Sequence, residues 1–416
     1  DLDLKTLSTD PEGGGATGLA EVFSDQMFRD LGVARHEIAE VAESAPGVSE
    51  AIVRLYRAYL DQRRLTDLGA IGRPEEGAGT GPSVLPSDWV RDFFQAQKNY
   101  FAELEEAADA LTADLACEPL DFALAARERL SGRHGISVRV VPVEVLPESV
   151  RRYDHHRKRL FLSEALTAEG RAFAQAYQLA LLEYGPLLDA LVDRSGPPDR
   201  STRGLLKVSL TNYLAAAVMM PYAAFHEAAE RSAYDIELVR ARFGVSFEQA
   251  CHRLTTLARP GARGVPFFML RVDSAGNISK RFAGATFPFS RFGGTCPRWN
   301  IHTSFRTPGR IATQIVETPD GQRYFTLSRT VSRFATPYSE GDTELAIGMG
   351  CELKFAERLV YSRGIDLRDP VATAIGPACR ICERAACPQR AAEPINRTLM
   401  VDDFTKSISP YPFASG

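Results

Sequence analysis

The chain has 416 residues, of which 44% are hydrophobic and 25% charged, and its formal net charge is −4 at pH 7. These shares are ordinary for a folded globular protein, so the composition excludes a disordered chain and a fibrous repeat. A chain of this length is expected to fold as two or three units. Its negative charge excludes a broad nucleic-acid-binding surface and leaves a local patch or a further domain for any contact with DNA.

Two segments bear on where the protein resides. The longest apolar stretch, residues 213–225, is interrupted by Pro221 and is shorter than the roughly 20 residues needed to cross a bilayer. Residues 1–15 are polar and acidic, unlike a secretory signal. The sequence therefore predicts a cytoplasmic protein without a membrane span. Because the chain opens with Asp1, we expect that a preceding segment has been removed.

The first half of the chain reads mainly as helix. Apolar residues at helical spacing predict a helical unit over residues 1–70, followed by a linker rich in glycine and proline over 71–86. A long amphipathic helix is expected over 88–115, with Ser87 or Asp88 as its N-cap.

The next segment combines strands and helices. The runs 136–147 and 159–166 predict two strands on either side of a basic turn, and helices are expected at 167–192 and 202–256. Residues 87–258 are therefore predicted to form an α+β domain.

After residue 258 the pattern changes to short strands. The expected strands are residues 267–272, 278–282, 299–305, 310–318, 323–331 and 345–350. Residues 259–416 are thus predicted to form a small antiparallel sheet of the kind found in sensory modules.

Three of the seven cysteines lie within nine residues. Cys379 and Cys382 form a Cys-x-x-Cys pair and Cys387 follows five residues later, which predicts a metal or iron–sulfur site. Such sites usually need four strong ligands, so a fourth cysteine is expected from elsewhere. Cys296 and Cys351 are the candidates. We favour Cys351 because it follows a predicted strand and opens a predicted helix, whose N-terminus stabilises negative charge.

The spacing also bears on the identity of the metal. Zinc knuckles usually carry two Cys-x-x-Cys pairs, and this segment has one, which favours iron and sulfide and leaves zinc as the alternative. Arg380, Arg384 and Arg390 alternate with the cysteines and are possible counter-charges, although such arginines are often simply solvated.

Helix 171–184 resembles the zinc-binding helix of the IrrE/ImmA type of metallopeptidase. Tyr177, Gln178 and Leu181 stand where that family carries His-Glu-x-x-His, and residues 201–225 contain no aspartate or glutamate. Zinc ligands and a general base are therefore missing, and we expect no catalytic residues and no enzymatic activity. The emptied cleft is a natural place for a ligand; the alternative is that these are simply core helices.

A basic turn stands out among the weaker signals. His155 and His156 are followed by Arg157, Lys158 and Arg159, a group able to bind phosphates, although a solvated turn is the commoner outcome.

Several motifs together resemble the short-chain fatty acyl-responsive transcriptional regulators. They are the degenerate zinc helix, residues 292–302, 318–331 and 350–352, and the cysteine segment 379–387. The resemblance spans nearly the whole chain. The fold it implies is α+β: a helical N-terminal unit, a degenerate metallopeptidase-like domain, and a C-terminal antiparallel-sheet domain with a cysteine cluster.

The resemblance also implies a function. It implies CoA or acyl-CoA as effector, a 4Fe-4S cluster on Cys351, Cys379, Cys382 and Cys387, and control of propionate and acetate metabolism, including the methylcitrate cycle. It further implies DNA as a partner through an N-terminal helix-turn-helix missing from these residues, and a homodimer.

For the ligand, we expect aromatic side chains to hold the pantetheine or acyl part and basic groups to meet the phosphates. The residues predicted to line this pocket, from rough helix placement, are Tyr100, Arg159, Tyr177, Gln178, Lys207 and Tyr213.

Overall fold

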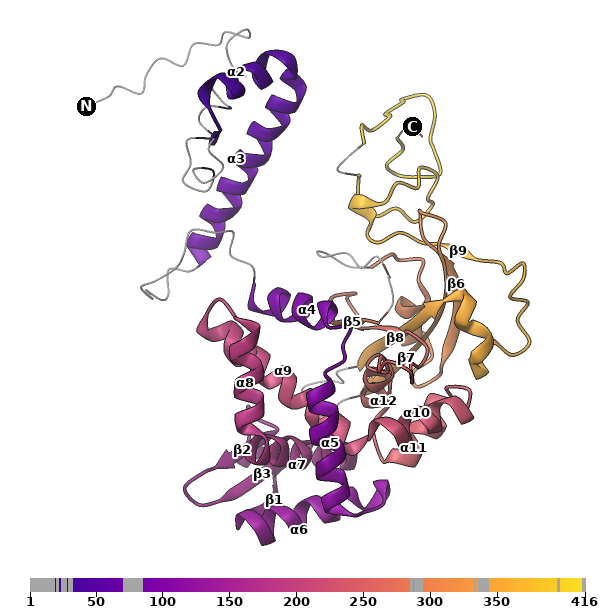
Figure 1. Ribbon diagram of the computed structural model, residues 1–416. Helices are drawn as coiled ribbons and strands as arrows, with labels where there is room; N and C mark the ends of the chain where they lie inside the picture. Colours follow the sequence, from indigo (N-terminus) through magenta and orange to yellow (C-terminus); the bar gives the residue numbers. More distant parts are fainter. Residues whose placement is uncertain are drawn as a thin grey trace. The chain divides into compact units, whose positions relative to one another are not determined.

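The computed structural model describes residues 19, 22–23, 28, 33–69, 85–284, 287, 295–332, 334–335, 344–394 and 397–413. They belong to two compact units, residues 1–84 and 85–416 (Figure 1). Residues 70–84, which include most of the predicted linker, lie outside the described residues.

The N-terminal unit is helical, as predicted. Its longer elements are α2 (Arg35–Ser44) and α3 (Pro46–Gly69). Pro46 is the first residue of α3, a position where the missing N–H costs no helical hydrogen bond. Ile38 and Val53 are buried in a small core of this unit.

Helices make up much of the second unit. They are α4 (Pro86–Ala96), α5 (Ala102–Leu115), α6 (Phe122–His134), α7 (Ala168–Glu183), α8 (Gly185–Ser195), α9 (Arg200–Met219), α10 (Tyr222–Arg231), α11 (Ile236–Phe243) and α12 (Phe247–Leu254). The 3₁₀ turns are η2 (Pro119–Asp121), η3 (Val143–Val145), η4 (Asn300–His302), η5 (Ser304–Arg306), η7 (Leu353–Arg358), η8 (Val360–Ser362) and η9 (Cys379–Ile381).

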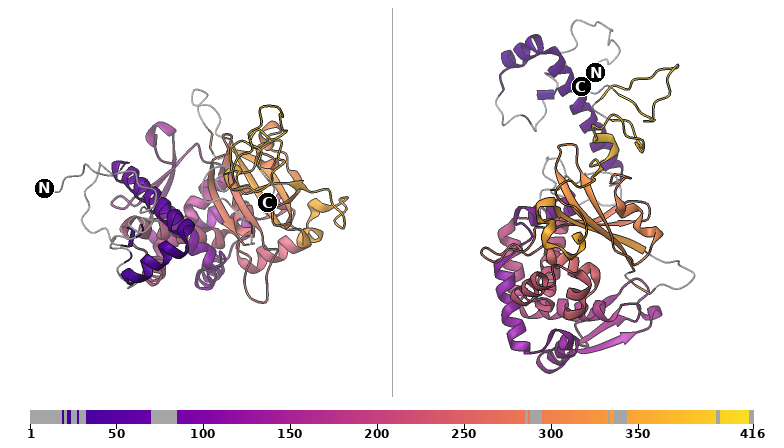
Figure 2. Two further views of the ribbon diagram at one scale, coloured as in Figure 1. Left: turned by 90° about the horizontal axis from the view of Figure 1, so that it is seen from above. Right: turned by 90° about the vertical axis from the view of Figure 1, so that its right-hand side faces the viewer.

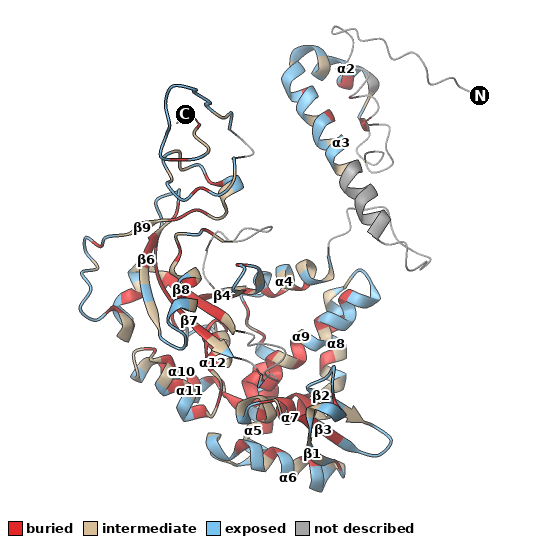
Figure 3. Ribbon diagram, turned by 180° about the vertical axis from the view of Figure 1, so that it is seen from behind, coloured by how far each residue is buried: buried red, intermediate tan, exposed pale blue. Residues whose placement is uncertain are grey.

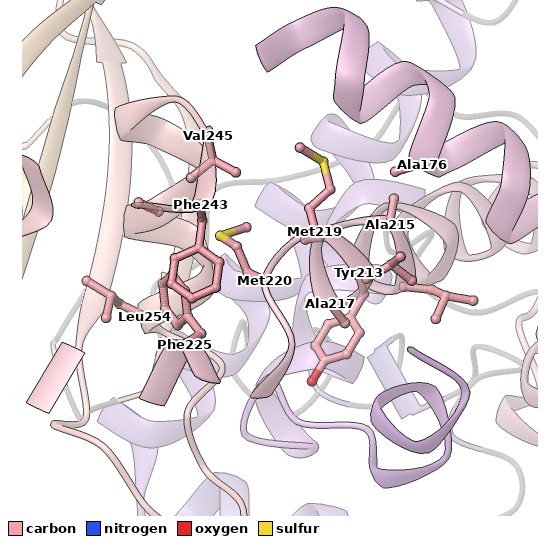
Figure 4. Close-up of a cluster of buried hydrophobic side chains, with 14 of the residues drawn as sticks. Ala176, Tyr213, Ala215, Ala217, Met219, Met220, Phe225, Phe243, Val245 and Leu254 are labelled. Carbon is pink, nitrogen blue, oxygen red and sulfur yellow. The ribbon is translucent and has the colours of Figure 1, made fainter. Parts of the chain in front are cut away.

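Helix α9 is the centre of the helical layer. Its second half is buried on nearly all sides, as Figure 3 shows. At its end Met219 and Met220 lie between Ala176 of α7 and the rings of Phe225 and Phe243 (Figure 4). An apolar helix of this kind is stable only when neighbours cover it all round.

A three-stranded sheet covers part of this layer. Strands β1 (Ser137–Val141), β2 (Arg151–Asp154) and β3 (Arg159–Ser163) lie in the order β1-β3-β2. β3 is parallel to β1 and antiparallel to β2. Leu160 and Leu162 of β3 are fully buried, so alternate residues of this strand face away from the core.

A six-stranded sheet forms the other layer (Figure 1). It consists of β4 (Phe268–Asp273), β5 (Ile278–Ala283), β6 (Ala312–Glu317), β7 (Arg323–Ser332), β8 (Glu344–Glu352) and β9 (Thr373–Ala374), in the order β5-β4-β8-β7-β6-β9. All pairs are antiparallel except β6 with β9. The α+β fold class predicted from the sequence is confirmed.

The two faces of β8 belong to different cores. Ile347, Met349 and Cys351 join the core that contains the helices. Ala346, whose side chain points to the opposite face of the strand, joins a second core that includes Cys296 and Trp299. Because side chains alternate along a strand, Cys351 and Cys296 are on opposite sides of the sheet.

The expected boundary at residue 258 does not separate two bodies. One continuous hydrophobic core contains Leu179 of α7, Leu214 of α9 and Met349 of β8. The predicted units 87–258 and 259–416 are therefore packed as one compact unit.

Four element predictions were wrong. The turn expected between the strands at residues 136–147 and 159–166 contains a further strand, β2, which pairs with β3. The helix expected over residues 88–115 is broken between α4 and α5, where Lys98 and Asn99 both have a φ of 53°. The strand expected at residues 299–305 is replaced by η4 and η5. The helix expected after Cys351 is a run of 3₁₀ turns, η7 and η8.

No single helix within the described ranges is long and apolar enough to cross a membrane. Only α9 and α10 taken together reach that length and composition, and they meet at a bend of 64°.

Candidate functional site

A cleft of about 1480 Å³ opens between the helices and the six-stranded sheet. Its walls come from α4, the start of β2, α7, α9, α12, β5 and the end of β7 (Figure 1). Apolar side chains such as Phe94, Phe173 and Phe282 alternate with charged ones along these walls. A large cleft with an apolar lining and a few polar groups is the usual form of a small-molecule site.

The described lining of the cleft is rich in positive charge. Six cationic and three acidic side chains line it. The cations are Arg91, Arg151, Arg240, Lys280, Arg281 and Arg329, and the acids are Glu169, Glu248 and Glu344. Four of the six cations pair with a carboxylate: Arg91 with Asp88, Arg240 and Arg329 with Glu237, and Lys280 with Glu248. The lining itself still carries more cations than acids, which favours an anionic ligand.

Arg151 is the cation whose charge is least compensated. Its guanidinium lies 3.9 Å from the centre of the Tyr177 ring, and one nitrogen donates to Gln178 Oε1 at 3.4 Å. Burial lowers the pKa of Arg151, and the Tyr177 side chain partly offsets this effect. No carboxylate of the described residues pairs with it. A dehydrated cation without an anionic partner is costly, and a bound anion would remove that cost.

Two further groups in and beside the cleft lack partners. The Nε of Arg329 and the Nε2 of Gln178 are buried and make no hydrogen bond within the described part of the chain. Arg329 is otherwise held by an ion pair with Glu237 and by the Phe247 ring, 4.8 Å from its guanidinium. Buried polar groups of proteins are nearly always hydrogen-bonded, so these two unpaired N–H donors indicate where a ligand can accept hydrogen bonds.

Of the six residues predicted to hold the ligand, Tyr177 lines the cleft. Gln178 is buried directly behind it, where it accepts the hydrogen bond from Arg151. The other four, Tyr100, Arg159, Lys207 and Tyr213, do not line it.

Three of those four side chains have partners elsewhere, and the fourth is exposed to solvent. Tyr100 packs against the Tyr222 ring, with 6.0 Å between centres. Arg159 is exposed, because Leu160 and Leu162 take the inward positions of β3.

Lys207 and Tyr213 lie on α9 and have partners outside the cleft. Lys207 pairs with Asp189 at 2.6 Å. The hydroxyl of Tyr213 donates to Glu105 at 2.5 Å in the core. Glu105 also pairs with Arg253 at 2.6 Å, so Tyr213 belongs to a buried structural network.

Helix α7 carries the three positions at which the sequence departs from the zinc-binding motif. Tyr177 and Gln178 are buried, and Leu181 packs against the core. Among the described residues, no three histidine, cysteine, aspartate or glutamate side chains are positioned to hold a metal ion. At the matching positions of α7, Tyr177 and Gln178 instead contact Arg151.

The cysteine segment is held by two arginines that bind backbone carbonyls. Arg390 is 3% exposed and donates to the carbonyls of Cys379 at 2.8 Å, Cys382 at 2.9 Å and Arg384 at 2.8 Å. Arg384 donates to the carbonyls of Glu317 at 2.8 Å and Ile375 at 3.0 Å. The segment is thereby tied to the β6–β9 edge of the sheet, a position seen in both Figure 1 and Figure 2. Two of the three arginines predicted as counter-charges, Arg384 and Arg390, thus bind the backbone of the segment.

Cys296 is the cysteine that approaches this segment. Burial raises the pKa of its thiol, a hydrogen bond from the Gly376 amide lowers it, and the nearby thiols of Cys379 and Cys382 raise it further. Gly376 is also in contact with Cys382, because a Cβ added there would lie 2.4 Å from its Sγ. Cys296 and Cys382 therefore both lie against Gly376, and Cys379 is near Cys296.

Cys351, predicted as the fourth ligand, lies away from the segment, and the geometry favours Cys296 in its place. Its side chain faces the helical core, and burial raises the pKa of its thiol to about 12, with a further contribution from Glu352. The sheet lies between Cys351 and the second core that contains Cys296. Cys387 is half-buried in the same segment as Cys379 and Cys382.

Comparison with known proteins identifies the family. Residues 256–411 match the family model described as short-chain fatty acyl coenzyme A regulator, C-terminal, and residues 132–255 match the IrrE N-terminal-like domain of the M78 peptidases. A solved Mycobacterium tuberculosis transcriptional regulator superposes with a TM-score of 0.75 at 39% identity, covering 79% of this chain and all of that one.

Comparison with individual proteins supports the same family. The chain is 41% identical to the helix-turn-helix-type transcriptional regulator RamB of M. tuberculosis, over 94% of this chain and 84% of RamB. It is 37% identical to the propionyl-CoA carboxylase regulator of Cereibacter sphaeroides, over 99% of this chain and 86% of that protein. It is also 37% identical to the regulator PrpR of M. tuberculosis, over 99% and 84%. These relatives are named as regulators and not as enzymes, and the chain belongs to the family of short-chain fatty acyl coenzyme A transcriptional regulators.

Proposed function

We propose that residues 85–413 are the ligand-sensing part of a regulator of propionate or acetate metabolism, and that the cleft binds CoA or a short-chain acyl-CoA. The observation that carries this proposal is Arg151, a partly buried cation in the cleft that has no carboxylate partner among the described residues. A phosphate group can accept two hydrogen bonds from such a guanidinium.

The rest of the cleft suits the two halves of a CoA molecule. Arg329 and Lys280 can meet the remaining phosphates, while Phe173 and Phe282 offer apolar surface to the pantetheine and acyl parts. CoA needs both kinds of contact, and a volume of about 1480 Å³ leaves room for the whole molecule.

We further propose that Cys296, Cys379, Cys382 and Cys387 hold a 4Fe-4S cluster. Four thiols fit the ligand requirement of such a cluster, and the hydrogen-bonded backbone around Arg390 holds two of them before any group is bound. When bound, the cluster supplies a redox-sensitive centre. A zinc ion would use the same thiols, and the visible absorption of protein purified without air distinguishes the two.

The partner of the whole regulator is proposed to be DNA, since two of the relatives are named as helix-turn-helix regulators. Regulators of this type commonly bind two half-sites as dimers, so the proposal includes a homodimer.

The test of the ligand is calorimetry with CoA and propionyl-CoA on wild-type protein, Arg151→Gln and Lys207→Gln. Loss of a charge-assisted contact to phosphate should weaken binding by roughly ten- to a hundred-fold in Arg151→Gln. Lys207 is the control, because it lies on a helix that lines the cleft but is paired with Asp189.

Two results would overturn the proposal. One is the lack of any heat of binding with either ligand at millimolar concentration. The other is an equal loss of affinity in both variants, which would show that Arg151 has no special role.

A further inference from the structure

The outer face of the three-stranded sheet carries a row of arginines that the proposed ligand site does not use. In the register of the sheet, Arg139 of β1 and Arg152 of β2 lie on either side of Phe161 of β3. In the next row Arg159 is opposite Ser137 and Asp154. Side chains in register on adjacent strands share one face, and the opposite face is the one that buries Leu160 and Leu162.

The cations of this face are exposed and free of ion pairs. Arg139, Arg152 and Arg159 are exposed, and within the described residues none of them forms a salt bridge. Arg152 lies over the Phe161 ring, 5.5 Å from its centre. Phe161 is therefore covered by an arginine and does not present an open apolar pocket.

The turn between β2 and β3 extends the same surface. Arg157 and Lys158 are exposed in this turn, which projects from the body of the unit in Figures 1 and 3. The carboxylate of Asp154 accepts a hydrogen bond from the Arg157 amide at 2.9 Å, and this bond and the Arg157 charge lower the pKa of Asp154. Asp154 thus shapes the turn as well as offsetting one charge.

We name the residues Arg139, Arg152, Arg157, Lys158 and Arg159 the basic sheet face. It places five cations beside a single carboxylate in a chain whose net charge is −4. The acidic residues of this region, Glu144, Glu148 and Glu164, come at the opposite ends of the three strands. Such segregation of charge costs self-repulsion and is compensated when an anionic surface binds.

We propose that the basic sheet face binds the phosphate backbone of double-stranded DNA, as a second contact beside the sequence-reading domain of the regulator. Adjacent strands lie about 4.8 Å apart, so arginines on the two outer strands are separated by roughly 10 Å and can reach different phosphates. Arginine forms paired hydrogen bonds with phosphate, and backbone contacts of this kind position a protein without reading sequence.

The geometry favours DNA over an acidic protein. A stable protein interface is usually anchored by aromatic or apolar side chains that enter pockets, and the basic sheet face offers exposed guanidinium groups over a covered ring. The inference rests on the proposed function only in taking DNA as the regulator's partner.

The experiment measures binding of the 416-residue chain to a fluorescent 20-base-pair duplex of unrelated sequence by anisotropy, from low to physiological salt. The double variant Arg139→Glu/Arg152→Glu should bind at least about ten-fold more weakly at low salt. The slope of log K against log salt concentration should also be less negative by about two, because two phosphate contacts are lost. The control is Arg363→Glu/Arg368→Glu, which changes the same charge at two exposed arginines elsewhere.

Three results would overturn the proposal: no duplex binding at low salt, equal weakening in both double variants, or tighter and equally salt-dependent binding to polyglutamate. Melting temperatures of both variants establish that they are folded. CoA affinity is measured in parallel, because it reports on the cleft alone. If the protein does not bind CoA, its duplex binding should still respond to the Arg139→Glu/Arg152→Glu change. If that change has no effect on duplex binding, CoA binding should still be detected.

Discussion

The cleft and the cysteine segment are prepared to different degrees for what they are proposed to bind. The cleft is walled by regular elements, and its key cation is fixed by a strand on one side and the Tyr177 ring on the other. The cysteine segment has little regular structure, and arginines bound to its carbonyls hold it to the sheet. Strand β7 joins the two regions, with Arg323 toward the cysteine segment and Arg329 in the cleft.

The two sites differ in what holds their side chains in place before a ligand binds. Secondary structure and a continuous core form the cleft without its ligand, so binding there requires little rearrangement. The described thiols are near one another but not positioned to hold a metal ion. Closing that site would add metal binding to the free energy of folding, as in other metal-bound loops.

The largest expected effect concerns the fourth thiol. Cys296→Ala should remove most bound iron and sulfide from protein purified without air, because three thiolates do not complete the ligand set. Cys351→Ala should keep its iron, since Cys351 faces the helical core. Iron and acid-labile sulfide are assayed in both variants. Full iron in Cys296→Ala, or loss confined to Cys351→Ala, would reverse the assignment.

The next effect tests the frame of the cleft. Glu105 is fully buried and joins α5 to α9 and α12 through Tyr213 and Arg253. Its pKa is lowered because the favourable contacts with Arg253 and Tyr213 together outweigh the opposing effect of burial. Glu105→Gln leaves the Arg253 charge buried and unpaired, and we expect a loss of about 3–5 kcal/mol in the free energy of unfolding.

Urea denaturation measures that loss, and the same helix provides the control. Glu103 pairs with Arg194 at 2.8 Å on the surface, where such pairs contribute about 0–1 kcal/mol. Glu103→Gln should therefore be nearly neutral. If the two variants were equally stable, the Glu105 network would have no structural role and Tyr213 would again be a candidate for ligand binding.

Several features of the two sites could be predicted from the sequence. The three clustered cysteines and the α+β class followed from spacing and periodicity, and the degenerate zinc helix from its resemblance to the IrrE/ImmA type. Arg151 was missed although a signal existed. Once Leu160 and Leu162 are placed inward, alternation puts Arg159 outside. Arg151 pairs with Leu162 across the sheet, so its side chain lies on the inward face, toward α7.

Other features could not be predicted from local patterns. Residues 345–350 are apolar or glycine throughout, and β8 is buried on both faces, so its alternation gave no sign of which face Cys351 occupies. The cleft lies between segments far apart in the chain, so the local spacing of apolar residues in any one segment does not predict it. The break after α4 lacks glycine or proline, and it is fixed by tertiary packing around the buried Asn99.

The smallest expected effect is a pH dependence located in the cleft. His252 lines the cleft against the Phe282 ring, 4.1 Å between centres, and its neighbours include Lys280, Glu248 and Arg253. Burial lowers its pKa to about 3, and the Lys280 charge adds to the effect.

The sign of that dependence follows from proton binding. Between pH 6.5 and about 3 the unfolded chain binds a proton at His252 and the folded chain does not, so this residue makes stability fall as pH decreases. The contribution is at most about 1.4 kcal/mol per pH unit, and partial exposure reduces it.

His252→Phe keeps the ring contact and should lose less stability than wild type between pH 7 and 5, measured as urea midpoints. His36→Phe, at an exposed position of α2, is the control and should follow wild type. If His252→Phe also followed wild type, His252 would not be held neutral, and the cleft would lack the dehydrated character from which its preference for an anionic ligand was inferred.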